Sequence, residues 1–260
     1  MITLCVRGKK GYSVLTATDK KMVSNVIYDT DKGVDNDYSD AIVTYCMDNN
    51  INIALGYSTY VIAAGWDKII EHERVIVFHD SLLPKYRGFC PLPAMLINGE
   101  TTIGVTAFWG TSAYDEGPII NQMYRNISYP IKINEAIEII CELYHVMTSY
   151  VIDNIYNLPS IGQRSEPSYS PWRDDIDYRI NWNWSAEKIK RFVDAVGPPY
   201  AGAYTSVNGK KIRIYDCEVV DDVIVEDRQS HIGKTIFKDT VICGEGLIKI
   251  KGDKFKTRYE

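Results

Sequence analysis

The side chains best suited to chemistry are one histidine and one aspartate, each of which follows an apolar segment. His79 comes directly after Val75–Phe78, and Asp115 comes shortly after Ile103–Trp109. Open α/β sheets bind ligands at the carboxyl ends of their strands. Two neighbouring strands could therefore bring Asp115 against His79. A carboxylate hydrogen-bonded to an imidazole fixes its tautomer and raises its basicity, so the pair is suited to proton transfer.

The segments that must position this pair alternate between short apolar runs and helices. Such runs are typical of strands in a sheet that is covered on both faces. We predict strands at Ile2–Val6, Val23–Tyr28, Ile51–Gly56, Val75–Phe78, Ile103–Trp109 and Pro118–Tyr124. We predict helices at Tyr38–Asn49, Pro93–Asn98 and Glu135–Asn157. The order indicates an α/β, Rossmann-like fold with a mainly parallel sheet and flanking helices.

The last third of the chain has a different pattern. Ser185 is a suitable N-cap for a helix that reaches Val196, and Asn208-Gly209 predicts a β-hairpin. Short apolar segments follow at Thr235–Phe237, Thr240–Cys243 and Leu247–Ile250. We therefore predict a catalytic domain over residues 1–178 and a small C-terminal subdomain, a helix plus a β-rich part, over residues 179–260.

Composition and charge exclude several classes of protein. The 260 residues are 45% apolar and 24% charged, as in a globular protein, and the net charge of −5 argues against a general nucleic-acid binder. The longest uncharged stretch contains three Asn and two Gly, so we expect no membrane insertion. The N-terminal basic residues follow the apolar run, which is the reverse of a secretory signal. Six widely spaced Cys without a CxxC pair predict a reduced, cytoplasmic protein with no cysteine-built metal site.

Three ordered motifs around His79 and Asp115 resemble those of the folate-dependent formyltransferases. They are HDSLLPKYRG at 79–88, GETTIGVT at 99–106 and DEGPIINQ at 115–122. The family motifs read Asn-x-His-x-Ser-Leu-Leu-Pro-x-Tyr-Arg-Gly, Gly-Glu-x-x-x-Gly-Val-Thr and Asp-x-Gly-x-Ile-x-x-Gln. A weaker likeness over 180–203 is similar to the region that joins the two domains in methionyl-tRNA and sugar formyltransferases.

The resemblance implies transfer of a formyl group from N10-formyltetrahydrofolate to an amine. The amine attacks, a tetrahedral oxyanion forms, and a proton must leave the nitrogen. Carried over by motif, His79 is the base or proton carrier and Asp115 is its partner. The family has an Asn two residues before the His, on the same face of the strand, where it donates to the formyl oxygen. Val77 stands there in this chain and cannot donate, so we expect another group to supply that hydrogen bond.

The resemblance also implies a folate site and no metal ion. The residues expected to bind the folate are Ser81, Leu82, Leu83, Arg87, Gly88, Tyr114 and Glu116. Three of these have a second interpretation. Ser81 could only cap the turn that follows it, and Arg87-Gly88 could serve turn geometry alone.

Five further residues are candidates for binding the amine substrate. Lys9 and Lys10, in a predicted loop after the first strand, could clamp a diphosphate, because a lysine-bearing loop at a strand end suits phosphate; they could also be surface charges. Tyr57, Ser58 and Tyr60 are expected to follow another strand and to line the acceptor pocket.

The acceptor expected from the resemblance is a nucleotide-linked amino sugar, for example a GDP- or dTDP-linked 4-amino-4,6-dideoxyhexose. The acidic chain and compact C-terminal part fit it better than methionyl-tRNA or glycinamide ribonucleotide. Such enzymes serve lipopolysaccharide O-antigen and related glycan synthesis and are often dimers, and the predicted hairpin is a candidate dimer contact. Two other classes stay open: a hydrolase that passes the formyl group to water, and a folate- or sugar-nucleotide-binding protein without catalysis.

Overall fold

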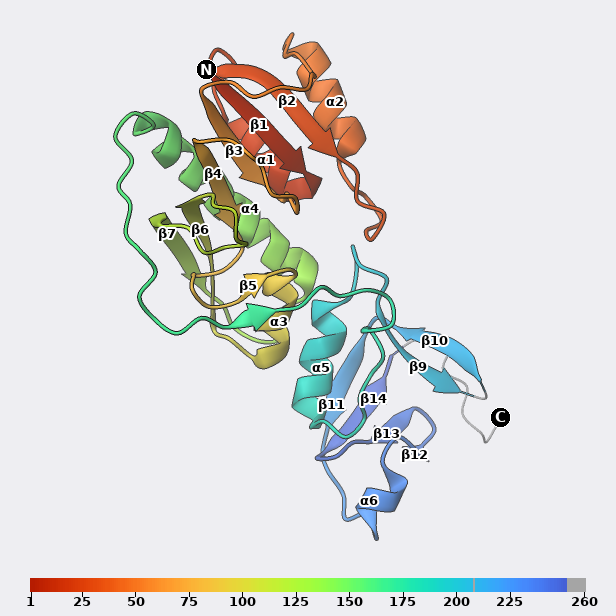
Figure 1. Cartoon of the computed structure of the whole chain (residues 1–260). Helices are drawn as coiled ribbons and strands as arrows, with labels where there is room; N and C mark the ends of the chain where they lie inside the picture. The colour runs from red at the N-terminus through yellow and green to blue at the C-terminus, as the bar shows by residue number, and fades with distance from the viewer. Residues whose placement is uncertain (208, 252–260) are drawn as a thin grey trace. The chain divides into compact units, whose positions relative to one another are not determined.

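The computed structural model describes residues 1–207 and 209–251 and contains two compact units (Figure 1). Unit 1 consists of residues 1–92, 101–127 and 135–172. Unit 2 consists of residues 93–100, 128–134 and the chain from Arg173 onward. The domain boundary placed after residue 178 stays a prediction. Among the described residues, no helix is long and apolar enough to cross a membrane.

Unit 1 is built on a six-stranded sheet with the strand order β2-β1-β3-β4-β6-β7. Its strands are β1 (Ile2–Arg7), β2 (Val23–Asp29), β3 (Tyr60–Ala64), β4 (Val75–His79), β6 (Thr102–Trp109) and β7 (Ile119–Asn126). The first four run parallel, whereas β6 is antiparallel to β4 and β7 is antiparallel to β6. The predicted α/β class with a mainly parallel sheet is confirmed.

Helices cover one face of this sheet. They are α1 (Gly8–Ala17), α4 (Ile133–Asp153) and, beside α1, α2 (Ser39–Asp48). Val6, Ala64 and Phe78 form one row across β1, β3 and β4. Gly11 of α1 is so close to this row that a Cβ on it would meet Val6 and Ala64, and the Tyr144 ring of α4 packs on Phe78 with ring centroids 5.5 Å apart. Close packing of α1 therefore requires a residue without a side chain at position 11.

The opposite face of the sheet carries a small apolar cluster that is covered by loops. The buried members of this cluster are Cys5, Val61, Ala63 and Val75. Trp66 and Ile70, from the segment after β3, pack against it together with Val77 of β4. Alternate residues of a strand point to the same face, so His79 also faces this side of β4. His79 therefore lies on the loop-covered face of the sheet.

The strand predicted at Ile51–Gly56 is wrong. That segment forms a single bridge to Val26, and Leu55 within it is 91% exposed. The Asn25 side-chain amide donates to two of its carbonyl oxygens, at 2.7 and 3.0 Å, and so holds the segment as a loop. The strand in this part of the sequence is β3, Tyr60–Ala64, whose five residues are all buried.

Unit 2 contains the predicted helix and β-rich part. Its helix α5 (Ala186–Ala195) is capped as predicted, because the Ser185 hydroxyl accepts a hydrogen bond from the Lys188 amide at 3.3 Å. The other elements are α3 (Pro91–Asn98, in unit 2 from Pro93), the hairpin β9 (Ala203–Val207) and β10 (Lys210–Ile214), the sheet of β11 (Cys217–Val220), β14 (Leu247–Ile250), β13 (Thr240–Ile242) and β12 (Thr235–Phe237), and α6 (Arg228–His231). The hairpin is confirmed, although Asn208 in its turn lies outside the described residues.

Candidate active site

The structure brings His79 and Asp115 together at the end of β4. His79 Nδ1 is 3.6 Å from Asp115 Oδ2, which is too long for a hydrogen bond and short enough for an ion pair with a protonated ring. His79 Nε2 donates to the carbonyl oxygen of Tyr86 at 2.8 Å. Both side chains are buried. Since the Tyr86 carbonyl engages Nε2, Nδ1 is the nitrogen that can exchange a proton, and Asp115 is the group it faces.

Asp115 reaches His79 by a route that differs from the expected meeting of two carboxyl strand ends. Because β6 is antiparallel to β4, β6 ends near the start of β4. Gly110 then donates to the Val75 carbonyl at 2.8 Å, and a Cβ on Gly110 would lie 3.1–3.4 Å from the Val75 and Val77 side chains. The segment after β6 therefore returns along the face of β4 and delivers Asp115 to His79.

Several hydrogen bonds fix Asp115 in a backbone conformation that few residues adopt. Its φ is +56°, in the left-handed region, which aspartate tolerates better than most residues. The Gly88 amide donates to Asp115 Oδ2 at 2.6 Å. The Gln163 side-chain amide donates to the carbonyl oxygens of Asp115 and Gly117 at 2.8 and 2.9 Å. The position of the carboxylate is thus set by the backbone conformation of Asp115, by the Gly88 amide and by the Gln163 side chain.

Arg87 lies inside this loop network. Its guanidinium donates to Glu116 Oε1 at 3.0 Å and to Gln163 Oε1 at 2.8 and 3.2 Å. The short strand β5 (Arg87–Gly88) pairs in parallel with β8 (Tyr169–Ser170). Gln163 was missed by the sequence analysis because it lies in no motif and in no periodic segment. Arg87 is buried, and its hydrogen bonds join the segment that carries Asp115 to the segment 163–170.

Thr106 joins the three sequence motifs into one hydrogen-bonded unit. Its hydroxyl donates to the Ser81 carbonyl at 2.6 Å and accepts from the Leu83 amide at 3.1 Å and from Gln122 Nε2 at 2.9 Å. The Ser81 hydroxyl donates to the Lys85 carbonyl at 2.6 Å, and Ser81 is fully buried. Ser81 and Leu83 therefore shape the turn, and their expected contact with folate stays a prediction.

Three other predicted folate contacts keep exposed surface. Leu82 is half-buried and packs so close to Gly104 that a Cβ there would lie 2.7 Å from Leu82 Cδ2. Tyr114 is 48% exposed, its hydroxyl donates to the Asp67 carbonyl at 3.5 Å, and Glu116 beside it is also exposed. These side chains can meet a ligand without disturbing the turn.

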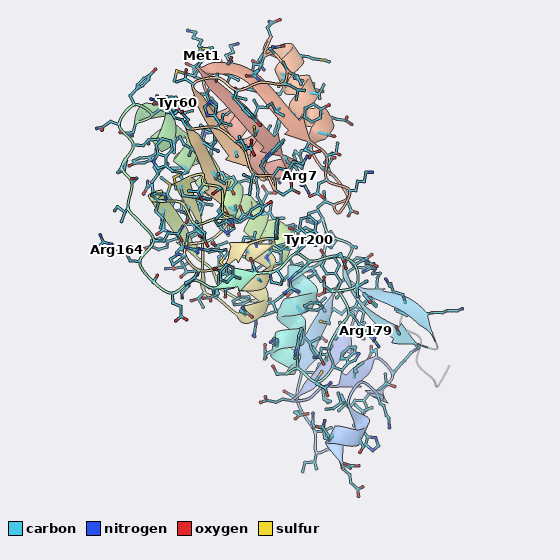
Figure 2. The ribbon with its side chains drawn as sticks, viewed as in Figure 1. Met1, Arg7, Tyr60, Arg164, Arg179 and Tyr200 are labelled. Carbon is cyan, nitrogen blue, oxygen red and sulfur yellow. The ribbon has the colours of Figure 1, made fainter. Side chains whose placement is uncertain are left out.

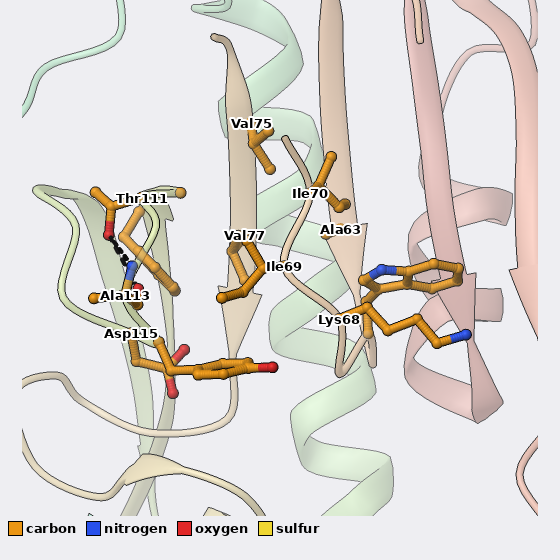
Figure 3. A pocket seen from close by; sticks show the side chains of 13 residues that line it. Ala63, Lys68, Ile69, Ile70, Val75, Val77, Thr111, Ala113 and Asp115 are labelled. Carbon is orange, nitrogen blue, oxygen red and sulfur yellow. Dashed lines mark hydrogen bonds between the residues drawn. The ribbon is translucent and has the colours of Figure 1, made fainter. Parts of the chain in front are cut away.

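A cleft opens on the loop-covered face of β4, next to Asp115. It holds about 460 Å³ of space, part of it open to solvent. Figure 3 draws its lining: β4, the segment after β3 and the segment after β6 contribute Val75, Val77, Lys68, Ile69, Ile70, Thr111, Ala113 and Asp115. Trp66 also lines the cleft, and its Nε1 is a buried donor with no hydrogen-bond partner among the residues that the structure describes. Such a donor costs roughly 1–3 kcal/mol when it stays unpaired.

Lys9 and Lys10 lie in the first turn of α1 rather than in the predicted loop. The chain passes directly from β1 into α1, so both lysines are helical. Lys10 pairs with Asp80, and the Tyr144 hydroxyl donates to the other oxygen of the same carboxylate. Burial raises the pKa of the Tyr144 phenol well above its usual range, and the charge of Asp80 raises it further. Lys10 is therefore anchored in the interior beside the turn that follows β4.

Lys9 is the more accessible of the two lysines. It pairs with Glu138 of α4 and lies over the Tyr38 ring, 5.9 Å from the ring centroid. Burial alone would lower the pKa of the Lys9 ammonium, but the hydrogen bond to Glu138 and the Tyr38 phenol raise it above the usual value. Lys9 thus stays charged at the carboxyl end of β1.

Tyr57, Ser58 and Tyr60 lie at the wrong end of the sheet for the role expected of them. Tyr60 begins β3 and is paired in register with Ile2, the first residue of β1. Figure 2 shows Tyr60 near Met1, whereas Arg7 lies at the other end of β1. Tyr57 and Ser58 precede β3 and Tyr60 is its first residue, so none of the three follows a strand. They lie at the amino ends of the parallel strands, whereas His79 lies at a carboxyl end, so we withdraw their assignment to the acceptor pocket.

No group of three or more metal-ligating side chains occurs within the described residues.

The family profile named formyl transferase matches residues 16–138, and the profile of the formyl transferase C-terminal domain matches residues 174–258. The chain belongs to the formyltransferase family. The likeness inferred from the three motifs is therefore confirmed.

A methionyl-tRNA formyltransferase from Geobacter metallireducens is 29% identical to this chain over 191 residues, which is 70% of this chain and 58% of that protein. The chain thus matches little more than half the length of this relative.

Two solved structures share the fold over nearly the whole chain. One is an N-formyltransferase from Helicobacter canadensis in complex with folinic acid and dTDP-3-aminofucose, with a TM-score of 0.71, 19% identity, and coverage of 96% of this chain and 99% of that one. The other is WlaRD, a sugar 3N-formyl transferase in the presence of dTDP and 5-N-formyl-THF, with a TM-score of 0.70, 21% identity, and coverage of 98% of both chains.

Proposed function

We propose that this protein is an N-formyltransferase that moves the formyl group of N10-formyltetrahydrofolate to the amine of a nucleotide-linked amino sugar. The observation that supports it most is the buried His79–Asp115 pair, which adjoins a partly open cleft. Ligand pockets commonly combine apolar walls with a few polar groups, as this cleft does. A GDP- or dTDP-linked 4-amino-4,6-dideoxyhexose is the acceptor we expect.

The proposed chemistry needs one proton transfer and one stabilised oxyanion. The amine nitrogen forms a bond to the formyl carbon, and the bond from that carbon to N10 breaks as the tetrahedral intermediate collapses and the carbonyl re-forms. The proton lost by the amine ends on N10, and Asp115 and His79 Nδ1 are the groups that carry it. The buried position of the pair keeps bulk water away from this exchange.

The side chains that line the cleft are chemically suited to the ring system of a folate. Its walls are largely apolar, from Val75, Val77, Ile69 and Ile70, and suit a flat heterocycle. The unpaired indole N–H described above adds a donor, and heterocyclic ring nitrogens and carbonyls are acceptors. Among the predicted folate contacts we retain Leu82, Gly88, Tyr114 and Glu116, with Arg87 as the residue that holds their loops.

The start of α1 suits the phosphates of a nucleotide sugar. Helix N-termini attract phosphate through their free amides and dipole, and α1 begins directly at the carboxyl end of β1. Lys9 adds a positive charge there, so we propose Lys9 as a phosphate contact and Lys10 as the residue that anchors this turn. The relatives that contain dTDP or a dTDP-sugar support this acceptor class.

The net charge of −5 disfavours methionyl-tRNA as the acceptor, although the Geobacter relative carries that activity in its name. We propose that the enzyme acts in the synthesis of surface glycans such as the lipopolysaccharide O-antigen. We also propose that it is a homodimer and works in the cytoplasm.

The proposal is tested by incubating the full chain with N10-formyltetrahydrofolate and a panel of amino-sugar nucleotides, while the absorbance of the folate product is followed. We expect turnover that depends on one member of the panel. Equal folate turnover with no acceptor would indicate a hydrolase. Turnover with methionyl-tRNA and with none of the sugars would assign the other family activity. Melting shifts with folate or sugar nucleotide, without turnover, would indicate a binding protein.

A further inference from the structure

Trp66 is held in place by its neighbours on both sides. Gly65 turns the chain at the end of β3 with a φ of +64°, and a Cβ on it would collide with the Arg7 carbonyl, so only glycine fits. Asp67 pairs with Arg7, and Lys68 pairs with Asp29. The Lys68 ammonium also lies 5.5 Å from the centroid of the Trp66 ring. The indole is therefore fixed before any ligand arrives.

The indole nitrogen of Trp66 has no acceptor within the described part of the chain. Its Nε1 is buried, and only one other buried side-chain polar atom there, Arg173 Nε, shares this state. The chain satisfies another indole in the usual way, because Trp182 Nε1 donates to Thr205 Oγ1 at 3.0 Å. Buried N–H groups in proteins are almost always paired, so an unpaired one that lines a cleft indicates an acceptor supplied by a ligand.

The other donors of the cleft already have partners. The Thr111 hydroxyl donates to the Ala113 carbonyl at 3.0 Å, and the Tyr114 hydroxyl donates to the Asp67 carbonyl. The Lys68 ammonium is paired with Asp29 and largely exposed. Val77 offers no donor, and the Asp115 carboxylate can only accept when it is ionised. Unlike these side chains, Trp66 has an N–H donor that is available to a ligand.

We propose that the Trp66 Nε1–H donates to an acceptor atom on the ring system of the bound formyl donor and so positions it in the cleft. This inference rests on the proposed function. The indole packs on Cys5, Val61, Ala63 and Val75, the buried cluster of the sheet, so the donor belongs to the apolar wall of the cleft. That location suits the ring system rather than the transferred formyl group, which must lie at the His79–Asp115 pair. Trp66 is a positioning residue.

The test removes the N–H and keeps an aromatic ring. Trp66→Phe should raise the Kd for 5-formyltetrahydrofolate and the KM for N10-formyltetrahydrofolate by about 5–10-fold and change kcat little, since the reacting atoms are not touched. Trp184→Phe is the matched control, because Trp184 packs against Phe192 of unit 2 and lines no part of this cleft. It should leave both constants unchanged.

A spectroscopic measurement separates a hydrogen bond from a packing effect. The chain has five Trp, so a ¹H–¹⁵N spectrum of the full-length protein contains five indole signals, and the one lost in Trp66→Phe is that of Trp66. We expect its proton to shift downfield when 5-formyltetrahydrofolate is added. Unchanged affinity in Trp66→Phe, or a Trp66 signal that stays in place while the ligand binds, would overturn the proposal and leave the proposed function intact. Absence of folate binding by the wild-type chain would overturn both.

Discussion

His79 uses its two ring nitrogens differently, and this division decides how the site can work. Nε2 donates to the backbone of Tyr86, which fixes the ring, and Nδ1 faces Asp115. The Asp115 carboxylate in turn accepts from the Gly88 amide. The sequence motifs predicted that this histidine and aspartate would meet. They could not predict Gln163 or Trp66, because a side chain brought in from a distant segment leaves no local pattern.

Replacing Asp115 by Asn should lower kcat by at least about 100-fold, with little change in the melting temperature. The amide keeps the size of the side chain, and its oxygen can still accept from Gly88, but it cannot pair with a protonated His79. Steady-state kinetics and thermal unfolding of the purified variant check this. The control is Asp48→Asn on the exposed end of α2, which should match the wild type. Near-normal turnover in a folded Asp115→Asn would remove Asp115 from the mechanism.

Replacing Val77 by Asn, the residue that the family motif has there, should not raise kcat. Val77 packs against the apolar cluster of the sheet, and a polar amide at that position should cost about 1 kcal/mol of stability. We expect the developing oxyanion to be met by protonated His79 or by a group from another loop, so a second donor adds nothing. Kinetics and urea unfolding measure the two effects. A gain in kcat of several-fold or more would show that the site lacks a donor it needs.

Among the elements, the site depends on how loops cross the sheet face opposite to α1 and α4. The apolar runs predicted β1, β2, β4, β6 and β7 within a few residues, because buried strands leave a strong signal. They missed β3, since its run merges with the apolar residues before it. They also placed Lys9 in a loop, because the helix α1 begins without a capping side chain that a sequence could reveal. The antiparallel β6, which sets the path to Asp115, follows from pairing that no local pattern records.

The turn after β4 should depend on the hydroxyl of Thr106. Thr106→Val keeps the shape and leaves the Ser81 carbonyl, the Leu83 amide and the Gln122 amide with fewer partners. We expect a loss of about 2–4 kcal/mol in the free energy of unfolding, measured with urea, and a parallel loss of turnover. Thr102→Val on the same strand removes an exposed hydrogen bond to Asn126 and should cost no more than about 0.5 kcal/mol. Equal effects of the two substitutions would contradict this role.

Gln163 should matter for catalysis although it belongs to no motif. Gln163→Leu removes the bonds to Arg87 and to the carbonyls of Asp115 and Gly117, so the loop that holds the Asp115 carboxylate loses its anchor. We expect kcat/KM for the formyl donor to fall by about 10–100-fold, because small displacements of a catalytic group have effects of this size. Gln229→Leu on the exposed face of α6 is the control. Unchanged kinetics in Gln163→Leu would mean that the loop is fixed without it.

In the whole chain, the two compact units differ in what they contribute to the proposed reaction. Each residue retained for the formyl transfer lies in unit 1, and unit 2 supplies a capped helix and a β-rich part. The sequence predicted both kinds of structure because their periods differ, 3–4 residues in helices and two in the hairpin. It could not predict that segments 93–100 and 128–134 join unit 2, since this grouping depends on long-range contacts.

Following the formyl group tests whether the chain transfers it from the folate to an amine. The full chain is given N10-formyltetrahydrofolate labelled with ¹³C in the formyl group, with and without an amino-sugar nucleotide from the panel, and the products are identified by ¹³C NMR. We expect the label to appear in an N-formyl sugar nucleotide only when the amine is present, and we expect Asp115→Asn to abolish this signal. Label that appears as formate at the same rate with or without the amine would contradict it.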